Sequence, residues 1–403
     1  MRISTVTIYE QSMSALNRQQ SEFTRVGQQI ATGRQVVNPS DDPQAASRAV
    51  QVSQSLAVTE QYTDSRISAR NALSQEESVL NSVGDAIASA KTLMVQAASD
   101  TLSDADRASV ASELRGIYET VIGQANATNG NGRHLFGGYQ DASEPFVRDA
   151  AGNVSYVGDT NTREQRIDAS RLMPVADNGQ AIFQSVHASA GYVAEVDQAN
   201  SGSLTFKGPQ IIDESDPNFG NTFQVEFDVT AGATTYSVDG GPAQPYEQGQ
   251  AVEFGGLSIT LKGEPADGDR IDVGKAENMN TDLFKTFEKA LAVLDQPAGN
   301  DAEKAARANT ISTAMREFDN SLDNVLTVRA SVGSRLQELN VVDAVAGNRE
   351  LNYTETLSNL IGDLSNPANF AEVVSQYSLR QVSLQAAQKA FVDIKGMSLF
   401  DRM

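Results

Sequence analysis

The pattern of apolar positions divides the chain into helical ends and a centre of strands. A seven-residue spacing of apolar residues places them on one face of a helix and is typical of coiled coils. Near the start this spacing joins Tyr9, Leu16, Phe23 and Ile30. Further along it joins Leu73, Leu80, Ile87 and Met94. The pattern therefore predicts a helix over about residues 1–33, a long helix over 43–99 and a third helix from about residue 103.

The last third of the chain repeats this organisation. An amphipathic helix is predicted over residues 281–294 and a long helix over 301–365, which Pro367 ends, followed by a final helix over 368–395. Asp343 and Glu350 interrupt the apolar stripe of the long helix, which either loosens the packing there or marks a polar layer. The stripe otherwise contains Val332, Leu336, Leu339, Ala346, Tyr353, Leu357, Leu360 and Leu364.

Helix boundary signals agree with this division. Gly33 is a common type of helix stop. Asp42 has the character of an N-cap, and Pro43 suits the first position of a helix. Ser103, with Asp106 three residues later, predicts a capping box at the third helix.

The centre alternates apolar and polar residues, which predicts half-buried strands. The alternation covers residues 223–229 and 257–261, and Asp239-Gly240 and Asp267-Gly268 are hairpin turn signals. The fold class is therefore α+β, with a long antiparallel coiled-coil bundle built from both arms and an inserted β-rich domain. The predicted parts are an assembly helix over 1–42, a bundle arm over 43–140, the insertion over 141–275, a second arm over 276–366 and an assembly helix over 367–403. The insertion is either one domain or two that divide near residue 200.

Composition narrows the function classes. The net charge is −21, and residues 141–280 hold 22 acidic against 8 basic side chains, so nucleic acid and anionic membranes are poor partners. The chain has no Cys and only two His, at positions 134 and 187, without other ligands at metal-binding spacing. We therefore predict no catalytic residue, no cofactor and no metal site, and a protein that is not an enzyme.

The start of the chain lacks a basic segment followed by an apolar run, and no stretch approaches ~18 consecutive apolar residues. We expect neither a cleaved signal peptide nor membrane insertion. The protein is then cytosolic or leaves the cell by another route.

The outermost helices carry narrow apolar stripes and little else on which to bury them. Residues 1–60 hold five Arg and five acidic residues, so these ends are nearly neutral on a very acidic chain. Such ends suit packing against other subunits. The alternative is that the two ends pair inside one monomer.

Several segments together resemble the hook–filament junction proteins of the bacterial flagellin superfamily. IATGRQVVNPSDDPQAASRA is similar to the flagellin pattern LSSGxRINxAxDDxAGxAIA, although Pro39 and Pro43 depart from the filament flagellin version. NGNGRHLFGGY, ITLKGEPADGDRIDV, RASVGSRLQELN and the C-terminal FAEVVSQYSLRQVSLQAAQKAFVDIKGMSLFDRM resemble other segments of these proteins. The residues that match are Gly33, Arg34, Asn38, Asp41, Asp42, Ala45, Arg329, Gly333 and Leu336.

The resemblance implies a structural protein of the extracellular flagellum, exported without a cleaved signal peptide. It implies a ring of subunits, with hook-associated protein 1 and flagellin as neighbours and a flagellar export chaperone before assembly. The assembly interface is then expected at the apolar residues of both ends, namely Tyr9, Leu16, Phe23, Ile30, Tyr377, Leu384, Phe391, Leu399 and Phe400.

Two alternatives remain at this stage. A filament flagellin is the near one, although such proteins usually begin closer to VINTNxxSL and end closer to VLSLL than this chain does. A secreted effector or enzyme with a site in the central zone is the distant one, and the scarcity of histidine argues against it.

Overall fold

The computed structural model describes the backbone of residues 5–99, 101–230 and 232–400, and within these ranges it leaves the side chains of residues 5, 6, 8 and 394–400 undescribed. The chain forms two compact units. We call residues 1–64 with 341–403 the terminal unit, and residues 65–340 the body. Two long helices, α2 (Pro43–Ala97) and α6 (Asp301–Ile361), contribute to both units.

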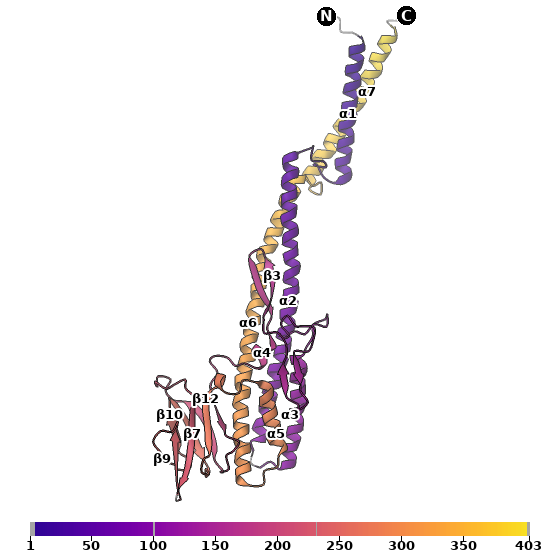
Figure 1. Ribbon diagram of the computed structural model, residues 1–403. Helices are drawn as coiled ribbons and strands as arrows, with labels where there is room; N and C mark the ends of the chain where they lie inside the picture. The colour runs from indigo at the N-terminus through magenta and orange to yellow at the C-terminus, as the bar shows by residue number, and fades with distance from the viewer. Residues whose placement is uncertain (1–4, 100, 231, 401–403) are drawn as a thin grey trace. The chain divides into compact units, whose positions relative to one another are not determined.

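The terminal unit also contains α1 (Thr5–Thr32) and α7 (Pro367–Phe400), which lie side by side (Figure 1). We call α1 and α7 the terminal pair. The predicted start of α2 is confirmed, because Asp42 Oδ1 accepts hydrogen bonds from the N–H groups of Gln44 at 3.0 Å and Ala45 at 2.9 Å. The side chain therefore satisfies donors that have no partner inside the helix.

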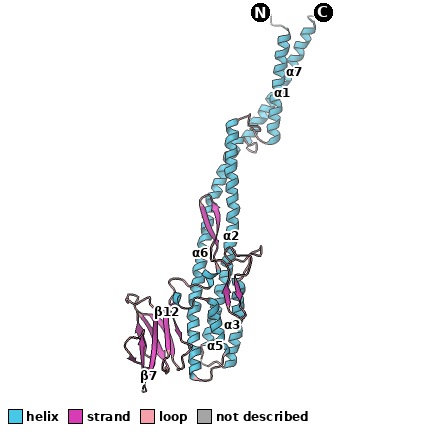
Figure 2. Cartoon of the chain, in the orientation of Figure 1, coloured by secondary structure: helices cyan, strands magenta, loops and turns pink. Residues whose placement is uncertain are grey.

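In the body, α2 and α6 run antiparallel with α3 (Asp104–Ala125) and α5 (Leu283–Asp295) beside them (Figure 2). Polar contacts along α2 and α6 join Glu77 to Arg329 at 3.0 Å and Lys91 to Asp319 at 2.5 Å. The predicted stripe is confirmed, because its four residues in α2 are fully buried: Leu73, Leu80, Ile87 and Met94. The capping box of Ser103 and Asp106 is also present.

Aromatic side chains fill the core between the helices and a layer of short elements. This layer contains the hairpin of β1 (Phe146–Arg148) and β2 (Val154–Tyr156) and the short helix α4 (Gly179–Phe183). Phe146 and Phe183 both pack on Phe284 of α5, at centroid distances of 5.0 and 5.8 Å. All three side chains are almost completely buried. The early part of the central zone thus packs on the helices.

A second hairpin, of β3 (Arg163–Asp168) and β4 (Arg171–Ala176), belongs to the body as well. Its apolar side chains Ile167, Met173 and Val175 are buried. Polar contacts also join it to the helices: Arg66 of α2 donates to the carbonyl of Ile167 at 3.0 Å, and Arg171 pairs with Glu338 of α6 at 2.7 Å.

The remaining strands form a β domain of two sheets, which we define as residues 192–275. One sheet has the order β5-β12-β7-β8-β9 and the other β10-β11-β6. Alternation along each strand sends one set of side chains between the sheets, where Val225, Ile259, Leu261 and Ile271 have no exposed surface. The strands are β5 (Tyr192–Val196), β6 (Thr205–Ile211), β7 (Phe223–Thr230), β8 (Ala233–Val238), β9 (Gln244–Pro245), β10 (Ala251–Phe254), β11 (Leu257–Lys262) and β12 (Arg270–Lys275). A single 3-10 turn, η1 (Ala276–Asn278), leads on to α5.

The two turn signals have different outcomes. Asp239 and Gly240 both have positive φ, at 50° and 69°, and they join the paired strands β8 and β9. Asp267-Gly268 lies between β11 and β12, which belong to different sheets, so the hairpin predicted there is wrong. A turn sequence fixes a local reversal of the chain, whereas the sheet partner of each strand is set by long-range packing. The α+β class with helical arms and a β-rich centre is confirmed.

Candidate functional site

The terminal pair brings together residues that are far apart in sequence. The ring of Tyr9 lies 5.4 Å from that of Phe391, and the ring of Phe23 lies 4.8 Å from that of Tyr377. These pairs define an antiparallel seam between α1 and α7. Arg380 of α7 also forms an ion pair with Glu22 of α1.

The seam is narrow. Among the described side chains, a buried apolar cluster at its base has three members, Val26 of α1, Val373 of α7 and Leu364 just before α7, with Ile30 and Tyr377 packed against it. Leu16, Leu384 and Phe391 are half-buried, and 43% of Tyr9 is exposed. The seven predicted interface residues with described side chains all belong to helices of this pair. The side chains of the other two, Leu399 and Phe400, lie outside the described residues.

A backbone clasp joins the segment after α1 to the segment after α6. The N–H groups of Gln35 and Val36 donate to the carbonyl of Ile361, each at 3.0 Å, and the N–H of Leu364 donates to the carbonyl of Gly33 at 2.9 Å. Gly362 adopts a φ of +62°, and a Cβ there would meet the Gln35 side chain at 2.6 Å. The clasp therefore fixes the start of α7 beside the end of α1.

The face of α7 turned away from α1 is unexpectedly apolar. The fractional exposure is 63% for Leu379, 62% for Val382 and 64% for Val392, and Phe370 is 49% exposed. At ~100° per residue, Leu379 and Val382 point about 140° and 160° away from Leu384. Phe370 belongs to the seven-residue row of Tyr377, Leu384 and Phe391, and Val392 points only about 80° away from Leu384, so neither lies on this opposite face. We call Leu379 and Val382 the outer stripe. Sequence reasoning missed it because it does not follow the seven-residue spacing, although a helical wheel of α7 would have revealed it.

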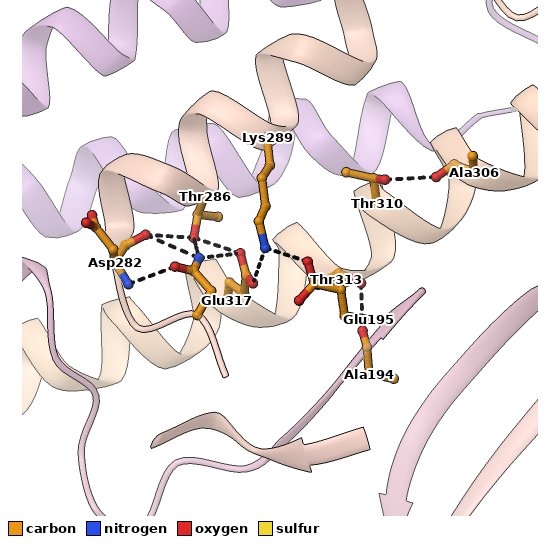
Figure 3. Close-up of polar contacts among 10 residues, drawn as sticks. Ala194, Glu195, Asp282, Thr286, Lys289, Ala306, Thr310, Thr313 and Glu317 are labelled. Atoms are coloured by element: carbon orange, nitrogen blue, oxygen red, sulfur yellow. Dashed lines mark hydrogen bonds and ion pairs between the residues drawn. The ribbon is translucent and has the colours of Figure 1, made fainter. Parts of the chain in front are cut away.

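In the body, a buried polar network lies at the junction of α5, α6 and the β domain (Figure 3). Glu317 of α6 accepts hydrogen bonds from Thr286 at 2.8 Å and Asn280 at 3.0 Å. Lys289 of α5 lies 2.6 Å from Glu195 of β5 and 3.7 Å from Glu317. Burial raises the pKa of Glu317, and the charge of Lys289 partly offsets this.

The β domain is attached to α6 through polar groups. Thr313 donates to the carbonyl of Ala194 at 2.7 Å (Figure 3), and Asn309 donates to the carbonyl of Leu204 at 2.8 Å. A partly open cavity of about 400 Å³ lies between these elements. Glu317 Oε2 accepts the hydrogen bonds of both Thr286 and Asn280, whereas Oε1 is buried without a hydrogen-bond partner among the described residues and lies 3.7 Å from the charge of Lys289. The polar contacts to Glu195, Ala194 and Leu204 position the β domain on the helices.

The described residues contain no group of three or more His, Cys, Asp or Glu side chains arranged to hold a metal ion. Among the described helices, none has a stretch long and apolar enough to cross a membrane. The two histidines have local structural partners instead: His134 Nδ1 lies 2.8 Å from the carbonyl oxygen of Asn126, and His187 Nδ1 lies 2.6 Å from the hydroxyl of Ser189.

Comparison with known proteins decides the family. The chain is 34% identical over 401 residues to flagellar hook-associated protein 3 of Escherichia coli strain K12, covering 99% of both chains. The same identity and coverage hold for the protein of that name from Salmonella typhimurium. The chain belongs to the flagellar hook-associated protein 3 family. It is therefore a structural protein of the extracellular flagellum at the junction of hook and filament, as the resemblance implied.

Two further comparisons agree with this membership. Residues 3–141 match the family described as bacterial flagellin N-terminal helical region. The structure is similar to a flagellar junction protein from Legionella pneumophila, with a TM-score of 0.66, 22% identity and coverage of 78% of this chain and 100% of that one. It is also similar to a Xanthomonas campestris protein of the same type, with a TM-score of 0.66, 25% identity and coverage of 76% and 99%. The flagellin match covers the N-terminal arm, whereas the hook-associated relatives match the whole chain.

Proposed function

We propose that the terminal pair assembles the chain into a ring of identical subunits at the hook–filament junction. The seam residues Tyr9, Leu16, Phe23, Ile30, Tyr377, Leu384 and Phe391 hold α1 and α7 together. Leu399 and Phe400, whose side chains lie outside the described residues, stay predicted members of the assembly interface. The outer stripe then packs on neighbouring subunits. In this role the protein is a scaffold without catalytic residues, cofactor or metal.

The exposure of the outer stripe is the observation that carries this proposal. Leu379 and Val382 are both more than half exposed, although the seam has already used the opposite face of the helix. Burying a Leu or Val contributes roughly 1.5–3 kcal/mol, so covering the stripe would supply much of a subunit contact. Packing of unlike surfaces, one subunit against the next, builds rings and tubes.

The chemistry of the stripe also suggests the partners. Before export, exposed apolar residues on a helix favour a flagellar export chaperone that covers them. After export, we propose that the ring contacts hook-associated protein 1 on the hook side and flagellin on the filament side, because related helical ends would offer similar apolar faces.

The decisive experiment replaces the two residues of the outer stripe. Leu379→Asp and Val382→Asp should leave the isolated protein folded, because both side chains point to solvent, but should abolish its incorporation at the hook tip. Gln381→Asp adds the same charge at a neighbouring exposed position and serves as the control. Complementation of a deletion strain, scored by motility and by immunogold labelling of hooks, gives the result. Normal incorporation of both stripe variants would overturn the proposal.

A further inference from the structure

A buried carboxyl group lies where the β3–β4 hairpin meets the helices of the body. Glu76 of α2 is 1% exposed. Its Oε1 accepts a hydrogen bond from the backbone N–H of Asp177 at 3.1 Å, just after β4. Its Oε2 is also buried and has no hydrogen-bond partner among the described residues. A buried carboxylate with an unsatisfied oxygen is costly, whereas a neutral carboxylic acid is tolerated.

The charged groups around Glu76 would not neutralise a negative charge on its carboxyl group in addition to that of Asp177. Arg335 of α6 forms an ion pair with the Asp177 carboxylate and donates to the carbonyl of Pro174 at 3.2 Å. The arginine is thus already committed to Asp177. On α2 itself the adjacent charge is Glu77, which pairs with Arg329 of α6. Glu76 therefore lies beside the carboxylate of Asp177, and the nearest arginine, Arg335, already forms an ion pair with that carboxylate.

We propose that Glu76, Asp177 and Arg335 form a proton-dependent latch, in which neutral Glu76 holds the base of the β3–β4 hairpin on α2 and α6 and loss of its proton to solvent loosens residues 174–177. Ionisation places a second negative charge beside Asp177, and the two carboxylates repel each other. Water can then solvate Glu76 only if the segment after β4 moves away.

The far end of the hairpin stays attached. Arg66 still binds the carbonyl of Ile167, and the side chains of Ile167, Met173 and Val175 remain buried. The latch therefore acts locally on residues 174–177. Burial, with the charge of Asp177 as the next cause, raises the pKa of Glu76 to about 8. Because the flagellum is outside the cell, this group experiences the pH of the surrounding medium.

The sign of the effect follows from this shift. The folded state holds the proton more tightly than the unfolded state, so the contribution of Glu76 to stability is complete at pH below the ordinary carboxyl range. It declines as the pH rises and is lost above about pH 8.

Amide hydrogen exchange on the full-length protein tests the latch. After correction for the intrinsic pH dependence of exchange, protection of peptides covering residues 171–179 should fall at least about tenfold between pH 6.5 and 9. Glu76→Gln, which mimics the neutral acid, should keep protection constant over this range. Glu77→Gln removes an adjacent partly exposed carboxylate and should behave like the wild type. An equal fall in Glu76→Gln, or no fall in the wild type, would overturn the proposal.

A second measurement tests the latch in the wild-type protein, so it does not depend on how Glu76→Gln folds. The carboxyl carbon of Glu76 can be followed by NMR in the wild-type protein as the pH is raised. Titration near pH 8 is expected, and titration in the ordinary carboxyl range near 4.5 would show that no neutral acid holds the hairpin.

Discussion

The terminal pair and the body bury their apolar residues in very different ways. In the body, Phe146, Phe183 and Phe284 are almost completely enclosed by residues of the same unit. At the terminal pair, the buried apolar cluster has three members among the described side chains, and α7 leaves the outer stripe open to solvent. We therefore expect the body to be stable as a monomer, whereas the terminal pair leaves apolar surface that we propose a neighbouring subunit covers. On this proposal, residues that maintain folding differ from those that support assembly, and the predictions below test that difference.

The largest expected effect tests the body. Phe284→Ala should lower the free energy of unfolding by about 3–5 kcal/mol, because it opens a cavity within a closed aromatic cluster. Phe391→Ala, the matched truncation in the terminal pair, should change the main thermal transition little, since Phe391 is only half-buried. Differential scanning calorimetry of both variants gives the answer. Equal losses would mean that the two regions share one cooperative core.

A charge in the seam separates folding from assembly. Leu384→Asp should leave the main transition of the monomer nearly unchanged, because the body contains most of the buried apolar residues. It should abolish ring formation, since α7 would no longer pair with α1 to present the outer stripe. Calorimetry and swimming assays are the measurements. A large fall in melting temperature would place Leu384 in a core shared with the body.

The sequence predicted those elements whose pattern repeats. The stripe from Leu73 to Met94 and the caps at Asp42 and Ser103 are present where the local signals placed them. Local signals could not show that residues 146–183 pack on the helices, because that depends on Phe146 and Phe183 meeting Phe284. The five-part division of the chain stays a prediction.

The candidate site was also predictable only where its apolar residues repeat regularly. Regular spacing identified the stripes of α1 and α7, but not whether each stripe meets the other or a different subunit. The outer stripe is irregular, and Glu76 occupies an ordinary position in a helix. Its burial becomes visible only when Asp177 and Arg335, distant in sequence, are brought beside it.

Helix caps provide a smaller test of the same comparison. Ser103→Ala removes the side chain that caps α3 in the body and should lower its free energy of unfolding by about 1 kcal/mol. Asp42→Ala removes the cap of α2 in the terminal unit. It should leave the unfolding of the body unchanged, while amide exchange accelerates at residues 43–47. Urea titration together with amide-exchange measurements on both variants distinguishes these outcomes. If both variants lost the same free energy of unfolding in the urea titration, the separation of the two units would be contradicted.

The smallest effect is expected when the β domain is removed. The N–H of Ala276 donates to the carbonyl of Gly191 at 3.1 Å, so the two cut ends adjoin and a short Gly-Ser linker can replace residues 192–275. The groups left behind on α6, Asn309 and Thr313, are polar and can bind water instead.

We therefore expect the shortened chain to keep a melting temperature within a few degrees of the original and to support motility. Removal of residues 163–176 is the contrasting deletion. That hairpin buries Ile167, Met173 and Val175 on the body, and its loss should lower the melting temperature clearly. The opposite outcome is that the two deletions lower the melting temperature equally. In that case polar attachment would not set the β domain apart from the rest of the body, and the β domain would be part of the same folding unit.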